Sequence, residues 1–398
     1  MLIALAAVCA AAPVSHAQTP SPDGARQARI HLGALALDPR LNIRDAGVDT
    51  NVFNTSTDAT RDVTLSVGPE LDEWLRAGRV AMAGASSVDW HYFRDSSSQR
   101  SLDASQTGAA DVDLGYVVPH LSGGFEQTRQ RLNLELDARV RRQMVRAAAG
   151  VTARLGAKLS IDLAQERRRL EFDDVIYQDV NLADALSRRE TQTTVTGRYV
   201  ATPLTTFVVR ASRQADRFLS ESERNTDSFA VMPGLELKPL ALISGSAFVG
   251  FRRFSPRASD LPRFQGVVAD VDLSYLVRDL TRLAVGVNRD VDYSYDDVSP
   301  YFVSTAFNAS VTQALGAGWD VVGRLARARL DYGAPLDAAL PDAAARRDHV
   351  NVYGFGVGRR LGTDVRVGID VDKAHRQSTL AAREYTGTRI GGSVTYGF

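Results

Sequence analysis

The sequence is poor in cysteine, in lysine and in long apolar segments. Its 398 residues include one cysteine, Cys9, and only three lysines among 47 basic side chains. The basic residues are balanced by 47 acidic ones, so the chain lacks the basic excess of a nucleic-acid-binding protein. Hydrophobic residues form 44% of the chain, which excludes an intrinsically disordered protein. Downstream of residue 17 there is no run of 18 apolar residues, so the sequence contains no transmembrane helix.

The first 17 residues are expected to be an export signal. Residues 2–13 are apolar and uncharged, and Ser15 and Ala17 place small residues at the −3 and −1 positions of a signal-peptidase site. Cleavage after Ala17 would remove Cys9 and leave no cysteine in the mature chain. An exported protein without disulfides must gain its stability from its fold.

Candidate tight turns recur about every forty residues along the rest of the chain. They fall at Arg76, Pro119, Ala157, Pro203, Pro239, Asp279, Ala317 and Gly362. Longer polar stretches, such as residues 173–188 and 333–347, lie midway between turns. A β-propeller can repeat at this length, but a propeller blade holds four short strands, and each period here holds two long runs. Short turns at one edge and long loops at the other are typical of an outer-membrane barrel.

Apolar and polar residues alternate in the runs between turns. From Leu102 onward the even positions are mainly apolar, whereas the odd positions carry Asp103, Asp111 and Asp113. The apolar face would pack inward in a soluble sandwich, but in a membrane barrel it meets lipid and the polar face lines the lumen. The runs are longer than a sandwich strand of about five or six residues. We therefore expect an all-β fold, a transmembrane antiparallel up-and-down β-barrel over residues 41–398.

The barrel is expected to have about 18 strands, with 16 as the alternative, and residues 18–40 to form a periplasmic segment before it. An even number of strands places both chain ends on the periplasmic side. The expected strands are 41–53, 61–72, 78–93, 100–118, 120–131, 140–155, 158–172, 188–200, 204–219, 226–238, 241–254, 263–277, 281–295, 300–315, 319–332, 347–361, 364–376 and 384–398.

Aromatic residues gather near both ends of these runs. Near the tight turns they include Trp74, Tyr116, Tyr199, Trp319 and Tyr396. Near the long loops they include Trp90, Phe218, Phe254, Tyr293, Tyr301 and Tyr332. Amphipathic rings prefer the headgroup level, so this pattern predicts two aromatic belts at the membrane interfaces.

The C-terminal residues carry a pattern of their own. Ile390, Val394, Tyr396 and Phe398 alternate with more polar residues up to the last position. This resembles the terminal signature of outer-membrane barrels, which the barrel-assembly machinery reads during biogenesis. Physically it is a closing strand with one lipid-facing side and an aromatic anchor.

The N-terminal region carries a second resemblance. The stretches HLGAL (residues 31–35), VDTNVF (residues 48–53) and DVTLSVGP (residues 62–69) are similar to the β-barrel porin 2 family. That family includes outer-membrane barrels associated with exopolysaccharide secretion. The resemblance implies a passive conduit for an exopolysaccharide or capsular polysaccharide in the outer membrane of a Gram-negative cell. Its implied partners are outer-membrane lipids, the transported polysaccharide and periplasmic polysaccharide-export components.

The lumen of such a barrel is where we expect function to lie. The acidic residues assigned to the inward face are Asp103, Asp111, Asp113, Asp162, Glu236, Asp270, Asp272, Asp290, Asp370 and Asp372. The basic ones are Arg146, Arg154, Arg198, Arg210, Arg252, Arg366 and Arg389. These side chains either brace the wall by ion pairs or offer hydrogen bonds to sugar hydroxyls. Their near balance of charge predicts no strong preference for cations or anions.

Two other functions stay open at this stage. One is a general diffusion porin for small hydrophilic solutes. The other is a barrel-embedded enzyme, for which His91, with Ser86 and Asp89 near it in sequence, is the candidate. The six histidines are not spaced as metal ligands, and no P-loop, dinucleotide-binding or nucleophile-elbow motif occurs. We therefore expect no enzymatic activity, no metal and no cofactor.

Overall fold

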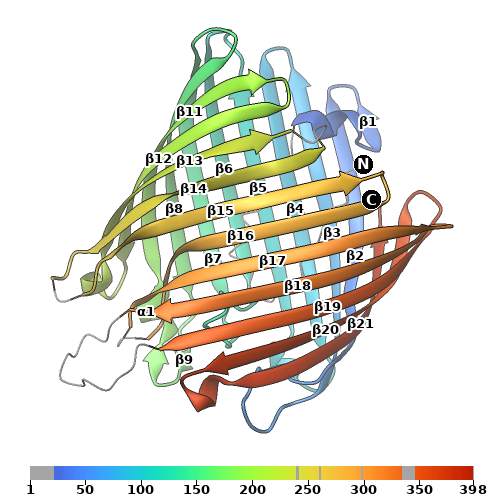
Figure 1. Ribbon diagram of the computed structural model, residues 1–398, viewed down its shortest axis with the longest axis vertical. Coiled ribbons are helices and arrows are strands. Elements are labelled where there is room, and N and C mark those ends of the chain that lie inside the picture. Colours follow the sequence, from blue (N-terminus) through green and yellow to red (C-terminus); the bar gives the residue numbers. More distant parts are fainter. Residues whose placement is uncertain (1–21, 239–241, 260, 297–298, 334–345, 398) are drawn as a thin grey trace.

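Eighteen long strands form one closed antiparallel barrel in the computed structural model, which describes residues 22–238, 242–259, 261–296, 299–333 and 346–397 (Figure 1). Consecutive long strands pair with each other, and β2 pairs with β21 to close the wall. The long strands are β2 (Leu35–Asp49), β3 (Asp62–Ala77), β4 (Val80–Phe93), β5 (Ser101–Val112), β6 (Val117–Thr128), β7 (Arg142–Arg154), β8 (Leu159–Phe172), β11 (Arg188–Thr202), β12 (Thr205–Phe218), β13 (Thr226–Leu237), β14 (Ile243–Pro256), β15 (Phe264–Val277), β16 (Thr281–Tyr293), β17 (Tyr301–Gly316), β18 (Trp319–Tyr332), β19 (Arg347–Leu361), β20 (Val365–Ser378) and β21 (Tyr385–Tyr396). The all-β barrel is confirmed, with 18 strands and not 16.

Short helices and strands lie at the two ends of the barrel. They are η1 (Pro22–Arg26), β1 (Ile30–Leu32), η2 (Ser97–Gln99), β9 (Ile176–Tyr177), β10 (Val180–Asn181), α1 (Leu182–Leu186), η3 (Ser222–Arg224) and η4 (Ala381–Arg383). Strands β9 and β10 with helix α1 belong to one long loop and lie at the end of the barrel that carries the long loops (Figure 1). Within the described residues, none of the helices is long and apolar enough to cross a membrane.

The exposure of side chains follows the expected alternation. On β20, Ile369 is 64% exposed, whereas its neighbour Asp370 points to the opposite face and is only partly exposed. On β19, Phe355 is 56% exposed between two glycines. Large apolar side chains that stay exposed on every wall segment form the outward band of a membrane barrel, because lipid takes the place of a protein core.

One predicted turn is wrong. The sequence pointed to a turn at Pro119, but residues 113–116 form the turn, and Pro119 lies within β6 opposite Val151. The turn uses Gly115 at φ 89°, a conformation that glycine adopts without steric cost. Asp113 therefore lies in the turn and not on the wall, which corrects its assignment to the lumen.

The first strand and the first tight turn also differ from the expectation. Strand β2 begins at Leu35, so the wall starts before the expected boundary at residue 41 and takes in the end of the segment 18–40. The first tight turn follows Ala77 and uses Gly78 at φ 60°, two residues after Arg76. The expected signal at residues 1–17 and the terminal Phe398 lie outside the described residues.

The aromatic residues behave differently at the two ends of the strands. Near the tight turns, Tyr116, Tyr199, Trp319 and Tyr396 are all exposed on the outer surface, as a belt requires. Trp74 is an exception, because it is buried against Ala36 and Ala83 under the N-terminal segment. The prediction of Trp74 as a belt residue is therefore wrong.

Near the long loops, the belt prediction fails for most of the rings. Phe218, Phe254, Tyr293 and Tyr301 form one buried cluster, with ring centroids of Phe218 and Tyr293 5.0 Å apart. Phe302, Leu330 and Tyr332 form a second buried cluster. Leu134, from the loop between β6 and β7, packs against the second cluster, and Arg224 of η3 lies 5.4 Å from the Phe218 ring centroid in the first. An alternation pattern cannot reveal such loop contacts.

Candidate functional site in the barrel lumen

Most of the predicted lumen residues are held in ion pairs along the wall. Arg324 of β18 contacts Asp370 at 2.9 Å and Asp372 at 3.2 Å, both on β20. The strand between them, β19, has glycines on this face, and a Cβ at Gly354 or Gly356 would collide with these carboxylates. The remaining pairs are Arg366–Asp320 at 2.5 Å, Arg252–Asp290 at 2.8 Å, Arg198–Glu236 at 3.8 Å, Arg389–Asp45 at 3.3 Å and Arg389–Asp49 at 3.1 Å.

The other predicted lumen residues have more varied surroundings. Asp162 accepts hydrogen bonds from Thr152 at 2.8 Å and lies 2.7 Å from His120. Arg210 lies over the Phe248 ring, 4.5 Å from its centroid. Asp111, Asp270 and Asp272 lie on the strands without a hydrogen bond or ion pair to any described residue. Arg154 pairs at 2.9 Å with Asp113 at the exposed turn, and Arg146 lies on β7 beside Gly124.

The outer mouth is crossed by the loop between β6 and β7, residues 129–141, which we call the inserted loop. It starts on one side of the barrel and reaches inward-facing residues of β16, β17, β18 and β20 on the far side. Arg376 of β20 donates hydrogen bonds to the Leu134 carbonyl at 2.9 Å and to Asp137 at 3.0 Å. Asn133 donates to Asp292 of β16 at 3.3 Å. Sequence analysis did not predict this insertion.

Apolar packing fixes the centre of the inserted loop. Leu134 packs against the cluster of Phe302, Leu330 and Tyr332 on the far wall. Leu136, which is 2% exposed, packs against Leu182 and Leu186 of α1 and against Tyr295. The inserted loop and the loop that carries α1 therefore share one small hydrophobic core inside the mouth.

Charged groups surround the same core. Asp137 is bound by Arg376 and by Arg383 of η4, at 3.0 Å and 3.4 Å. Arg376 also pairs with Asp348 of β19 at 2.5 Å, and both of these side chains are fully buried. Asn54, from the loop after β2, donates to Asp137 at 3.1 Å. Loops and strands that are far apart in sequence thus converge on one carboxylate of the inserted loop.

Glu135 is the most perturbed acid of the inserted loop. It is 1% exposed, and its burial raises its pKa to about 7, although the Ser294 hydroxyl and Arg346 favour the charged form. The Ser294 hydroxyl donates to one Glu135 oxygen, and the Tyr295 N–H donates to the other at 3.3 Å. Arg346 lies 3.9 Å from the carboxylate. The inserted loop therefore contains a carboxyl group that titrates near neutral pH.

His91 lies in a different constellation from the one considered in the sequence. Its Nδ1 is 2.8 Å from Ser66 Oγ and its Nε2 is 3.2 Å from Asp103, whereas Ser86 bonds to Gln106 on the outward face. Ser66 is only 6% exposed, so a substrate carbonyl cannot reach its hydroxyl in this arrangement.

Asp103, the acid of that constellation, anchors the base of the inserted loop. It accepts hydrogen bonds from the Thr128 hydroxyl at 2.8 Å, the Arg129 N–H at 3.0 Å and the Gln130 amide at 3.0 Å. These contacts give Ser66, His91 and Asp103 a structural role beside the loop. Among the described residues, no group of three histidine, cysteine or acidic side chains could hold a metal ion.

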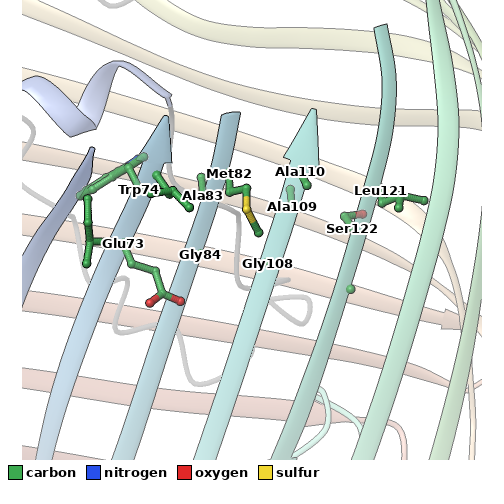
Figure 2. A pocket seen from close by; sticks show the side chains of 13 residues that line it. Glu73, Trp74, Met82, Ala83, Gly84, Gly108, Ala109, Ala110, Leu121 and Ser122 are labelled. Carbon is green, nitrogen blue, oxygen red and sulfur yellow. The ribbon is translucent and has the colours of Figure 1, made fainter. Parts of the chain in front are cut away.

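A pocket on the wall lies outside the lumen. It is a shallow groove over Gly84, Gly108 and Gly123, flanked by the outward side chains of Met82 and Leu121 (Figure 2). The Glu73 side chain lies across Gly84, and Glu73 accepts a hydrogen bond from Gln106 at 3.3 Å. Because Met82 and Leu121 are 45% and 62% exposed on the lipid-facing surface, this groove is not part of a conduit.

Comparison with known proteins places the chain in a family. Residues 26–398 match the family described as Putative beta-barrel porin 2, so this chain belongs to that family. The protein is a porin-like barrel of the outer membrane. No curated protein sequence matches it.

Several solved structures are similar to this chain at low sequence identity. OccK2 (OpdF) of Pseudomonas aeruginosa, in complex with glucuronate, has a TM-score of 0.50 and 11% identity, covering 90% of this chain and 97% of that one. OccAB3 of Acinetobacter baumannii has a TM-score of 0.48 and 12% identity, covering 91% and 99%. The FrpB iron transporter of Neisseria meningitidis has a TM-score of 0.44 and 9% identity; this chain covers 90% of its own length and 64% of that of FrpB.

Proposed function

We propose that the protein is a diffusion channel for small hydrophilic solutes, narrowed at its outer mouth by the inserted loop. Barrels of this strand number enclose an aqueous channel. The observation that carries the proposal is the pair of hydrogen bonds that Arg376 donates to Leu134 and Asp137, because they tie the inserted loop to the far wall. A loop fixed across the mouth admits solutes by size.

The lining supports passage of neutral polar solutes. Acidic and basic side chains lie close together along the wall, as in the group of Arg324, Asp370 and Asp372. Paired charges produce little net field, while their free lone pairs and N–H groups can exchange hydrogen bonds with hydroxyl groups. Sugars and similar polyhydroxylated molecules fit this chemistry.

The second candidate is the polysaccharide conduit that the family resemblance implies. A polymer chain has to pass the mouth while the inserted loop bridges it, so this function requires the loop to move aside. The alternation of Asp and Arg along β18 and β20 would suit a sliding polymer as well as a small sugar. An enzymatic role has less support, because the Ser66 hydroxyl is buried.

The test is a variant in which residues 130–140 are replaced by a short Gly-Ser linker. The wild-type chain, reconstituted in liposomes, is expected to admit mono- and disaccharides and to exclude long oligosaccharides. The variant should show a larger single-channel conductance and a higher size limit. Equal conductance of both proteins would overturn the role of the inserted loop.

The polymer conduit is tested separately by secretion. In a clean deletion strain, unchanged surface polysaccharide would reject export, and its loss with rescue by the wild-type gene would support it. A strain that secretes polymer only with the linker variant, and not with the wild type, would reject a conduit with the loop in place.

A further inference from the structure

Cations recur at one level on the lipid-facing side of the wall. Nine strands run from a tight turn toward a long loop, and on five of them the residue eight positions after the strand start is an outward cation. They are Arg167 on β8 (from Leu159), Arg213 on β12 (from Thr205), Arg289 on β16 (from Thr281), Arg327 on β18 (from Trp319) and Lys373 on β20 (from Val365). On β14, Arg253 lies ten positions after Ile243. We call these six residues the basic belt.

The basic belt lies on the same face as the exposed apolar side chains. Arg167 lies an even number of residues from Leu163 on β8, so both point to the same face, and Leu163 is 55% exposed. Arg253 is related in the same way to Phe251 on β14, which is 51% exposed. All members are exposed except Arg289, which is half-buried. The basic belt therefore points away from the lumen and cannot act on a solute inside it.

The belt cations have no acidic partners among the described residues, unlike four cations just beyond them. No acidic side chain in the described part of the chain pairs with any belt member. Closer to the loops, Arg217 and Arg257 share Asp227 at 2.7 and 3.0 Å, and Arg329 and Arg347 share Asp331 at 2.7 and 2.9 Å. These four outer cations are thus neutralised on the outward face itself, whereas the belt is left uncompensated.

The level of the belt coincides with the edge of the hydrocarbon region. Eight residues at roughly 3.3 Å each, on strands tilted by about 40°, rise about 20 Å above the tight turns. The apolar band of an outer-membrane barrel is about 25 Å tall. Measured from the tight turns, the belt Cα atoms therefore lie about 5 Å below the upper edge of that band, a gap that the long Arg and Lys side chains span to reach the headgroups. The leaflet on the long-loop side is the outer leaflet.

The belt covers only one part of the circumference. At the same position on β2, β4 and β6 the outward residues are Ile43, Val88 and Phe125. If a membrane border alone favoured cations there, these three strands would carry them too. The asymmetry indicates a binding surface that faces one direction.

We propose that the basic belt from β8 to β20 binds the phosphate groups of lipid A, the phosphorylated glycolipid of the outer leaflet. Neighbouring belt cations stand two strands apart, about 10 Å, so that they can hold separate phosphates of one multiply charged lipid. Phe229, Phe307 and Tyr353 lie between them in register, opposite Arg213, Arg327 and Lys373. These rings are 52%, 40% and 55% exposed and offer apolar contact to acyl chains.

The experiment measures lipid binding to the full chain purified in detergent, by native mass spectrometry with a defined lipid A carrying two phosphates. The loss variant is R213Q/R253Q/R289Q. The matched control is R329Q/R347Q, which removes two outward cations that already have an acidic partner. A gain variant, V88R/F125R, places cations at the equivalent positions of β4 and β6, which lie outside the basic belt.

Each belt arginine removed should weaken the apparent affinity about fivefold, and the triple variant about 100-fold. The control should change it less than twofold, and the gain variant should add binding capacity. Lipid A stripped of its phosphates should bind the wild type as weakly as the triple variant binds intact lipid A.

Three results would overturn the proposal. They are equal binding of intact and dephosphorylated lipid A to the wild type, equal binding of lipid A to the wild type and the triple variant, and binding of phosphatidylglycerol as strong as that of lipid A. The first two results can be obtained without the gain variant, so they do not depend on whether that variant folds. Solute conductance of the triple variant should equal that of the wild type, so this outcome is separate from the proposed channel function.

Discussion

The two ends of the barrel hold ion pairs of similar length in opposite surroundings. At the outer mouth, Arg376 and Asp348 lie 2.5 Å apart, and both side chains are 0% exposed. At the tight-turn end, Arg154 and Asp113 lie 2.9 Å apart, with side chains 45% and 54% exposed. Distance alone would rank the pairs as near equals. Their surroundings decide how much each pair contributes to stability. Only at the outer mouth does removal of one partner leave the other charged, buried and without a partner.

The largest expected effect is that of Arg376→Ala. Removal of this guanidinium leaves Asp348 buried without its partner and releases Asp137 of the inserted loop. We expect the free energy of unfolding to fall by about 3–5 kcal/mol, measured by guanidinium titration in detergent micelles. Single-channel conductance should rise as the inserted loop detaches. A loss below about 1 kcal/mol would mean that the outer mouth is not the dry environment described.

Glu135→Gln should remove a pH dependence of the inserted loop. With the loop in place the Glu135 pKa is about 7, because burial opposes the charge more than Ser294 and Arg346 favour it, and in water it would be near 4.5. Since the inserted state binds the proton more tightly, insertion is fully stable below pH 4.5 and weakens as pH rises from 4.5 to 7. The total change is about 3 kcal/mol.

Conductance measured from pH 5 to pH 8 checks that sign. The wild type should conduct more at pH 8 than at pH 5, and the Gln variant should give one low value across the range. A wild-type conductance that falls as pH rises would contradict the assignment of Glu135. Asp292 and Arg383 also face this carboxyl, so a variant at either position should shift the midpoint without removing it.

A smaller effect is expected for Arg366→Gln. This pair with Asp320 lies at the tight-turn end but is partly buried, with side chains 22% and 10% exposed. If burial and not the end of the barrel sets the energy, the loss of stability should be intermediate, about 2 kcal/mol. The measurement is the same guanidinium titration, and a loss equal to that of Arg154→Ala would refute the role of burial.

The smallest effect on stability is expected for Arg154→Ala. Its exposed pair with Asp113 is screened by solvent, so the free energy of unfolding should hardly change. It serves as the matched control for Arg376→Ala, because both variants remove one arginine from one ion pair. A change comparable to that of Arg376→Ala would remove the distinction between the two ends.

The wall could be predicted well from sequence, and the mouth could not. Period-two alternation depends only on neighbouring residues, so it located the outward Leu102 and Ile369 and the inward Asp370 without any knowledge of pairing. The turn near residue 119 was misplaced because proline is a turn signal, whereas the backbone used Gly115. Pairs such as Arg324–Asp370 were half predicted: the acid was assigned to the lumen, and its partner was not.

The amino-acid sequence by itself determined a barrel with apolar outside and charged inside, because alternation and turn spacing are local properties that survive without long-range contacts. Only the tertiary structure decided that residues 129–141 cross the mouth. That loop alternates apolar residues such as Leu134 and Leu136 with polar ones, a pattern that a strand would also show. Its position across the mouth is set by Arg376, Asp348 and α1, which lie far from it in sequence. Closure of the wall brings these groups together, and no local pattern encodes which groups a closed ring will place face to face.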